Sequence, residues 1–250
     1  PFRHRVRKAF LLHFFLIEHY PHRNKTYYCR RNSRAYCGNA NPSIHFTLKV
    51  RCDIKLESYK EYKKIEISML GTYQIENAIV ALEAIEALKS AGYQIKEKAV
   101  VVGMAETTWQ GRFSIINNRP LIVIDGAHNE DGIEAFLKTV ENKKDAGRRF
   151  LLFGVVADKQ YEGMISQIAA SGLFSQIAVT VLESDRSASL DTLREIWRQY
   201  NQVDLSFHES AEDAYQCLVS EKQEADEIYI AGSLYLIGQM KALMRRKPDD

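Results

Sequence analysis

The chain has 250 residues, of which 46% are hydrophobic and 26% charged, and its formal net charge is +2. This is the composition of a folded globular protein, and so small a charge excludes bulk attraction to a polyanion such as nucleic acid. No apolar run is long enough to cross a bilayer, so we expect no membrane association.

The cysteines predict a reducing compartment. There are four in 250 residues, too few and too scattered for a disulfide framework: Cys29, Cys37, Cys52 and Cys217. None belongs to a Cys-x-x-Cys pair, so we expect no zinc site. Residues 3–17 resemble a signal peptide, but His13 interrupts the apolar stretch and no small-residue cleavage site follows. We therefore expect a cytoplasmic protein.

The positive charge is concentrated at the start of the chain. Residues 1–52 hold eleven Lys or Arg and one acid, Glu18. Residues 1–48 show no sustained period of 3.6 or 2, which leaves two interpretations. They form either a basic arm for nucleic acid or a truncated, mistranslated or poorly ordered start. We favour the second, and expect no nucleic-acid partner.

A regular pattern begins after this segment, from about residue 54. Two strands are followed by a helix with apolar residues on one face, which Gly92 should end. A shorter helix should follow. The expected ranges are 54–57 and 64–70 for the strands, then a helix after Gly71 and another at 96–103.

From residue 109 onward, strands and helices alternate. We expect strands at 113–117, 121–124, 149–156, 176–182, 205–208 and 227–231, and helices at 130–142, 160–170, 190–200, 211–220 and 233–245. Continuous apolar runs such as 150–153 indicate strands buried on both faces. The pattern predicts an α/β fold, a Rossmann-like, mostly parallel sheet with helices on both faces, over residues 109–250.

Ligands of open parallel sheets bind beyond the carboxyl ends of the strands. Four loops with unusual chemistry occupy such positions in this sequence. They are Asp125-Gly126-Ala127-His128-Asn129, Ala157-Asp158-Lys159-Gln160, Ser184-Asp185-Arg186 and Gly232-Ser233. Their shared position predicts a ligand site at this edge of the sheet.

The first of these loops has two interpretations. Asp125 can accept hydrogen bonds from a ribose diol or hold a cation, and Gly126 lets the backbone turn sharply. His128 and Asn129 open a helix, whose free N–H groups favour anions. The alternative is a plain strand–turn–helix junction with Asn129 as the helix cap.

Two further positions carry polar groups with a structural alternative. In Trp109-Gln110-Gly111-Arg112, Gly111 allows close approach of the backbone, and Arg112 offers a planar fork for phosphate or carboxylate. The alternative is a surface arginine. Gln74 and Asn77 share a face at the start of a helix. Either they bind a ligand, or they cap the first turn.

Three common motifs are absent from the sequence. No Gly-Lys dipeptide occurs, so there is no phosphate-binding P-loop, and neither Gly-x-Gly-x-x-Gly nor Gly-x-Ser-x-Gly is present. The sequence therefore gives no dinucleotide fingerprint and no Gly-x-Ser-x-Gly nucleophile elbow.

Five motifs in series resemble the folylpolyglutamate synthase/dihydrofolate synthase family of the Mur ligase superfamily. They are Gly71-Thr72-Tyr73-Gln74-Ile75-Glu76-Asn77-Ala78, Trp109-Gln110-Gly111-Arg112, Asp125-Gly126-Ala127-His128-Asn129, Asp158-Lys159 and Gly232-Ser233-Leu234-Tyr235-Leu236-Ile237-Gly238. The resemblance covers residues 54–250. Tyr73 stands where the family often has His, and Gln160 where it often has an acid.

The resemblance implies a fold, a reaction and a set of contacts. Residues 49–108 would be a remnant of the central ATP-binding domain and 109–250 the carboxyl-terminal domain. ATP would phosphorylate a carboxylate of folate or dihydropteroate, and the amine of L-glutamate would displace the phosphate. By resemblance, ATP would contact Asn77, Arg112 and Asp125, with Arg112 on the phosphates and His128 beside the nucleotide. We assign to the edge of the substrate or nucleotide site Gln74, Asn129, Asp158, Lys159, Arg186 and Ser233.

The resemblance also implies what lies elsewhere. The P-loop and the Mg²⁺ ligands of the family belong to an amino-terminal part that this sequence does not contain. We therefore expect a monomer that is inactive alone and binds ATP weakly at most. Two alternatives stay open: a non-catalytic nucleotide-binding remnant, and a fragment of a peptidoglycan Mur ligase.

Overall fold

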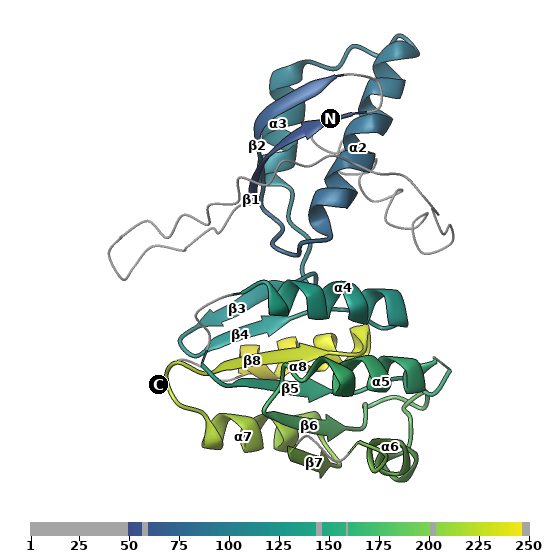
Figure 1. Ribbon diagram of the computed structural model, residues 1–250, viewed down its shortest axis with the longest axis vertical. Helices are drawn as coiled ribbons and strands as arrows, with labels where there is room; N and C mark the ends of the chain where they lie inside the picture. The colour runs from purple at the N-terminus through teal and green to yellow at the C-terminus, as the bar shows by residue number, and fades with distance from the viewer. Residues whose placement is uncertain (1–49, 57–59, 144–146, 159, 201–203, 247–250) are drawn as a thin grey trace. The chain divides into compact units, whose positions relative to one another are not determined.

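The computed structural model describes residues 50–56, 60–143, 147–158, 160–200 and 204–246 (Figure 1). The atypical segment 1–48, with Cys29 and Cys37, lies outside these residues, as does Lys159. No helix in the described ranges combines the length and apolarity needed to cross a membrane.

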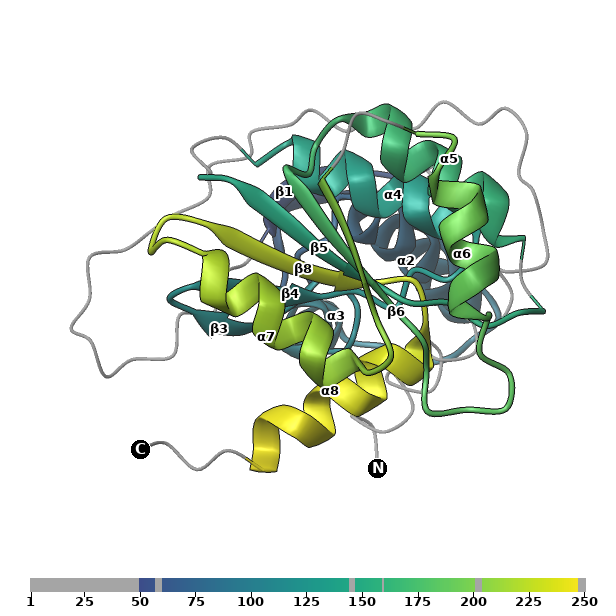
Figure 2. The same ribbon diagram turned by 90° about the horizontal axis from the view of Figure 1, so that it is seen from below.

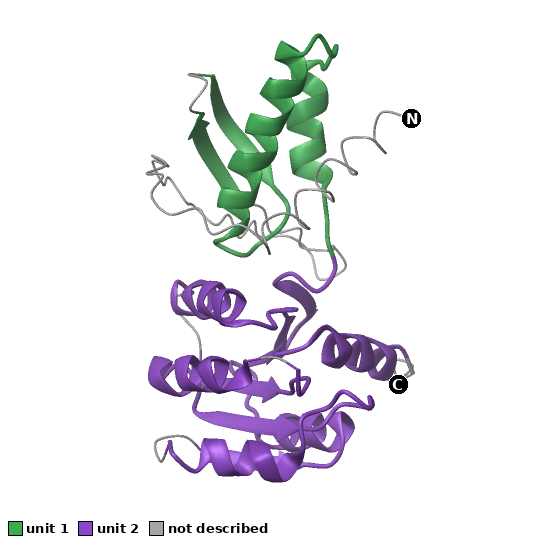
Figure 3. Cartoon of the chain, turned by 90° about the vertical axis from the view of Figure 1, so that its right-hand side faces the viewer, with its two compact units in different colours: residues 1–109 green, residues 110–250 purple. Residues whose placement is uncertain are grey.

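The chain divides into two compact units, residues 1–109 and 110–250, coloured separately in Figure 3. In the described part of the first unit, two antiparallel strands pack against two helices. The elements are β1 (Val50–Lys55), β2 (Glu61–Ile67), α2 (Gln74–Ser90) and α3 (Glu97–Glu106). The order of elements is the predicted one, but β1 and β2 begin several residues earlier than expected.

Helix α2 follows the predicted pattern at its end but not at its start. Ala91 is its C-cap, and Gly92 follows with φ of +92°, a left-handed angle that glycine adopts without strain. At the other end the N-cap is Tyr73, and no side chain makes a capping hydrogen bond. The alternative that Gln74 and Asn77 cap the first turn of this helix is therefore wrong.

The second unit is a six-stranded sheet in the order β3-β4-β8-β5-β6-β7. Its strands are β3 (Ser114–Asn118), β4 (Leu121–Ile124), β5 (Arg149–Phe153), β6 (Gln176–Thr180), β7 (Asp204–His208) and β8 (Glu227–Ala231). The β3–β4 pair is an antiparallel hairpin, and every other pairing is parallel. The predicted α/β class with a mostly parallel sheet is confirmed.

Helices cover both faces of this sheet (Figure 2). Helices α7 (Ala211–Glu221) and α8 (Leu234–Arg246) bury one face, whose core includes Ile124, Leu152 and Ile230. The opposite face carries α4 (Glu130–Glu141), α5 (Tyr161–Ser171) and α6 (Leu190–Trp197). On that side Phe136 of α4 meets Tyr229 of β8 edge-on, at 5.9 Å between ring centroids.

Two strands are shorter than predicted. The expected strand at 149–156 ends at Phe153, and the one at 176–182 ends at Thr180. The residues beyond pair with each other: Val156 forms an antiparallel bridge with Ser187, and the Ala157 N–H donates to the Arg186 carbonyl at 2.7 Å. Val155 and Val156 continue the apolar run of β5 in sequence, but the chain leaves the parallel ladder there, so periodicity alone could not place the end of the strand.

Candidate functional site

The carboxyl ends of β4, β8, β5 and β6 are neighbours in the sheet, as the parallel order requires. Backbone hydrogen bonds join the loops that follow them. The Gly232 N–H donates to the Ala127 carbonyl at 2.9 Å, and the Gly126 N–H donates to the Gly111 carbonyl at 2.6 Å. Three segments that are distant in sequence thus form one continuous rim along this edge of the second unit.

Asp125 is the central buried acid of this rim, with 2% of its surface exposed. Its Oδ2 accepts the backbone N–H of Phe113 at 2.9 Å, and its Oδ1 accepts the N–H of Ala127 at 2.9 Å. Each oxygen of the Asp125 carboxylate therefore accepts one backbone N–H group. Asp125 holds the Gly111–Phe113 turn against the end of β4, a structural role that the sequence did not indicate.

The turn that Asp125 holds carries Arg112 between two left-handed residues. Gly111 has φ of +86° and Phe113 has φ of +45°, an angle that a bulky side chain rarely adopts. The Gly111 N–H also donates to Ser114 Oγ at 3.0 Å. The Asp125 bond and the burial of the Phe113 ring keep this turn in place, so the backbone of Arg112 is fixed before any ligand arrives.

The two glycines have the reverse of their expected roles. Gly111 is required for its left-handed angle, whereas Gly126 has no positive φ. A Cβ on Gly126 would lie 2.5 Å from Leu234 Cδ2 and 3.1 Å from the Gly111 carbonyl oxygen. Gly126 therefore permits close approach of α8 and of the Arg112 turn, and not a sharp bend.

At the start of α4, Asn129 is the N-cap. Its Oδ1 accepts the N–H of Gly132 at 2.8 Å, which confirms the capping alternative for this side chain. Glu130 and Asp131 already complement the positive end of the helix dipole. This helix start is therefore a poor anion site, and Arg112 is the better candidate for phosphate.

His128 precedes this cap and is half-buried. Its Nδ1 lies 2.7 Å from the Gly126 carbonyl oxygen. Because a carbonyl only accepts, this contact places a proton on Nδ1, which leaves Nε2 as the unprotonated nitrogen of the neutral ring. The loop thus sets the tautomer of His128.

The loops after β5 and β6 bring Asp158 and Arg186 together as an ion pair, and each side chain is 52% exposed. Arg186 Nη1 also donates to the Tyr235 hydroxyl at 3.4 Å, and the guanidinium carbon lies 5.9 Å from the centre of that ring. The bonds to Asp158 and Tyr235 raise the pKa of Arg186 above its ordinary value. Tyr235 was not predicted as a site residue; its position two residues after Ser233 was the available signal.

Ser233 is 2% exposed and precedes α8. Its Oγ accepts the N–H of Tyr235 at 3.1 Å, so its hydroxyl stabilises the start of this helix. The last predicted loop residue, Lys159, lies outside the described residues.

In the first unit, Gln74 and Asn77 lie one turn apart at the start of α2. Asn77 Nδ2 donates to Gln74 Oε1 at 3.0 Å. Gln74 has 0% of its surface exposed, and its Nε2 has no hydrogen-bond partner among the described residues. A buried donor that stays without a partner costs about 1–3 kcal/mol.

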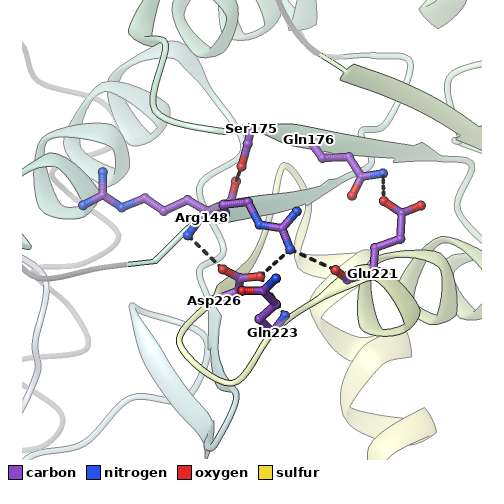
Figure 4. A network of polar contacts seen from close by, with 7 residues as sticks. Arg148, Ser175, Gln176, Glu221, Gln223 and Asp226 are labelled. Carbon is purple, nitrogen blue, oxygen red and sulfur yellow. Dashed lines mark hydrogen bonds and ion pairs between the residues drawn. The ribbon is translucent and has the colours of Figure 1, made fainter.

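The opposite, amino edge of the sheet is closed by its own side chains (Figure 4). Asp226, before β8, accepts the Arg148 and Gln223 N–H groups at 2.9 and 2.7 Å, and Arg148 Nη2 at 2.8 Å. Burial alone would raise the pKa of Asp226, but these bonds together lower it below its ordinary value. Gln176 and Glu221 are paired similarly, at 2.9 Å. This network is structural.

Comparison with known proteins places this rim in a recognised domain. Residues 111–234 match the family described as Mur ligase, glutamate ligase domain. The chain is 27% identical over 192 residues to dihydrofolate synthase/folylpolyglutamate synthase of Bacillus subtilis, covering 74% of this chain and 42% of that protein. It is 30% identical over 183 residues to a probable bifunctional folylpolyglutamate synthase/dihydropteroate synthase of Halobacterium salinarum, covering 72% and 21%.

A solved structure has the same fold. Mycobacterium tuberculosis folylpolyglutamate synthase complexed with ADP superposes with a TM-score of 0.70 at 25% identity, covering 80% of this chain and 46% of that one. The chain therefore spans less than half of the length of each of these relatives.

Proposed function

From the premise that this chain belongs to the folylpolyglutamate synthase/dihydrofolate synthase family of the Mur ligase superfamily, we propose that it forms part of an ATP-dependent ligase that adds L-glutamate to folate. Residues 49–108 belong in this proposal to the central ATP-binding domain, and 109–250 are the carboxyl-terminal domain. Dihydropteroate is a second acceptor. The observation that carries the proposal is the rigid turn that presents Arg112 beside the buried Asp125.

The proposed reaction has two steps. A carboxylate oxygen of the folate attacks the γ-phosphorus of ATP, which forms an acyl phosphate and releases ADP. The uncharged amine of glutamate then attacks the acyl carbon, and phosphate leaves as the amide forms. Both steps depend on holding anionic groups in a fixed geometry more than on covalent help from the protein.

Each proposed contact uses a feature of the described residues. Arg112 contacts the phosphates, because its backbone is fixed and its guanidinium is always charged. Asp125 and His128 lie at the same rim and contact the nucleotide. Asn77, on α2, is also assigned to ATP. Asp158, Arg186 and Ser233 are assigned to the edge of the substrate or nucleotide site, where Asp158 and Arg186 form an exposed ion pair.

Magnesium belongs to this chemistry, since phosphoryl transfer from ATP generally needs it. The described residues contain no group of three or more His, Cys, Asp or Glu side chains that could hold a metal ion. We propose that the magnesium ligands lie in the part of the complete enzyme outside this chain, and we assign no magnesium ligand here.

Phosphate release tests the proposal. The complete enzyme that contains this chain should release phosphate from ATP only when folate or dihydropteroate and L-glutamate are both present. Arg112→Gln should lower kcat/KM for ATP at least about 100-fold, the effect of removing one charged transition-state contact. The matched control is Arg198→Gln, an exposed arginine at the end of α6, which should leave kcat/KM unchanged.

Two other results would change the conclusion. Equal stimulation by a UDP-muramyl substrate would move the enzyme to the peptidoglycan branch. For the chain of 250 residues alone, we expect no turnover and weak ATP binding, because its sequence has no P-loop. Tight ATP binding by this chain in calorimetry would contradict that expectation and favour a nucleotide-binding function without catalysis.

A further inference from the structure

The hydroxyl of Ser114 closes the turn that carries Arg112. Ser114 is the first residue of β3, and its Oγ accepts the Gly111 N–H at 3.0 Å. Arg112 and Phe113 are the two residues between the donor and the acceptor, so the bond spans the segment that presents the arginine. An alanine could begin the strand at this position, but it would leave the Gly111 N–H without this acceptor.

The other hydrogen bonds of the turn hold different peptide groups. The Gly126 N–H donates to the Gly111 carbonyl at 2.6 Å, which holds the peptide before Arg112. Asp125 Oδ2 accepts the Phe113 N–H at 2.9 Å, which holds the peptide after it. Neither bond reaches the peptide that enters the turn, whose N–H belongs to Gly111. The serine hydroxyl holds that peptide.

The serine bond matters because a glycine stands at this point. Gly111 has φ of +86°, and glycine populates positive and negative φ about equally, so its own preference does not select this angle. Rotation about φ would turn the Gly111 N–H away from Ser114 Oγ and break the bond. The hydroxyl therefore stabilises the backbone conformation of Gly111 from which Arg112 is presented.

We propose that Ser114 is a positioning residue, which holds the Gly111 N–H and so keeps Arg112 in the orientation that contacts the phosphates during transfer. The proposal rests on the assignment of Arg112 to the phosphates of ATP in the proposed function. Electrostatic stabilisation of a transition state depends on charged groups that are in place before the reaction begins. Ser114 supplies this through the backbone and touches no substrate itself.

The test measures phosphate release from ATP by the complete enzyme that contains this chain, with folate and L-glutamate present. Ser114→Ala should lower kcat about fivefold, the fold-change that one neutral hydrogen bond is worth. The KM for ATP should stay within about twofold, as expected for an interaction that matters in the transition state. Ser114→Thr keeps the hydroxyl and should retain kcat within about twofold.

A double-mutant cycle with Arg112→Gln separates positioning from general damage to the fold. A residue that acts through Arg112 has nothing to position once the guanidinium is gone, so Ser114→Ala should then change kcat by less than about twofold. The matched control is Ser210→Ala, which removes another hydroxyl that accepts a backbone N–H, that of Asp213 at 3.0 Å. It should lower stability and leave kcat unchanged, because it caps α7 and holds no part of the turn.

Each contrary result has a distinct meaning. Full kcat in Ser114→Ala, equal losses in the alanine and threonine variants, or the same loss with and without Arg112→Gln would overturn the positioning role and leave the proposed function intact. An unchanged kcat/KM for ATP in Arg112→Gln alone would overturn the assignment of Arg112 to the phosphates, and with it the role of Ser114. Phosphate release that does not depend on folate and L-glutamate would overturn the proposed function itself.

Discussion

Asp125 Oδ2 accepts the backbone N–H of Phe113, twelve residues earlier in the chain, at 2.9 Å. Phe113 has a left-handed φ of +45°, and the centroid of its ring lies 6.3 Å from the ring centroid of Phe136. The carboxylate and the aromatic core together stabilise a turn that would be strained alone. Since Arg112 lies in this turn, a buried acid at the end of β4 determines where an arginine is presented.

Replacing this acid should therefore affect both stability and function. Asp125→Asn turns one oxygen into an N–H₂ group, which faces a backbone donor. We expect the free energy of unfolding to fall by about 2 kcal/mol, the cost of losing a charge-assisted hydrogen bond in a buried site. Urea unfolding of the chain measures it. Asp185→Asn, at an exposed position, is the control and should change stability by less than about 0.5 kcal/mol. Equal losses of unfolding free energy in the two variants would contradict the role of Asp125 in holding the turn that carries Arg112.

The cap of α4 makes a separate prediction. Asn129→Ala should lower the free energy of unfolding by about 1 kcal/mol, because the Gly132 N–H loses its acceptor. Asn129→Asp should keep most of the stability, since aspartate caps equally well. Neither change should alter nucleotide affinity more than about threefold, as expected if the amide serves the helix and not the ligand. A large loss of affinity in both variants would instead place Asn129 on the ligand.

Two glycines of the rim should differ in their tolerance of alanine. At Gly232, φ is +114° and a Cβ would lie 2.6 Å from the Gly154 carbonyl oxygen. Gly232→Ala therefore strains the backbone and places its methyl group against a backbone oxygen that cannot easily move. We expect it to lower stability by more than about 2 kcal/mol. At Gly126, the nearest atom is the end of the exposed Leu234 side chain, which can move, and the nearest backbone atom, the Gly111 carbonyl oxygen, is farther away at 3.1 Å. Gly126→Ala should therefore lower stability by about 1 kcal/mol. Thermal unfolding compares the two, and the reverse order would refute the distinction.

The loss of folding stability at low pH should depend in part on Asp226. The pKa of this carboxyl is lowered in the folded protein, so its stabilisation is fully present above the unfolded pKa, about 3.9. It is lost as the pH falls through the lower, folded pKa. Asp226→Asn should be less stable by about 2 kcal/mol at pH 7, and this difference should shrink below about pH 4. Urea unfolding at a series of pH values measures it, and a difference independent of pH would contradict the role of the charge.

The sequence by itself determined the elements and the class of the fold. Apolar runs and helical spacing predicted the strand and helix order, and β4 and β8 have the predicted bounds. Helices and strands depend on residues close together in the sequence, and the spacing of the apolar residues shows that local pattern. The strand ends were missed where the chain leaves the parallel ladder: Val156 pairs with Ser187, thirty-one residues away, and no local pattern reports that.

The tertiary structure decided what the polar residues do. Asp125 was expected at the ligand edge, but only long-range packing placed Phe113 against it and buried it. Asp158, Arg186 and Tyr235 meet because parallel strands bring their loops to one edge. Gln74 could have capped a helix, but it is buried and its Oε1 accepts the Asn77 amide N–H. Hydrogen-bond partners depend on which segments fold beside one another, so the same amide or carboxylate caps, braces or binds according to its neighbours.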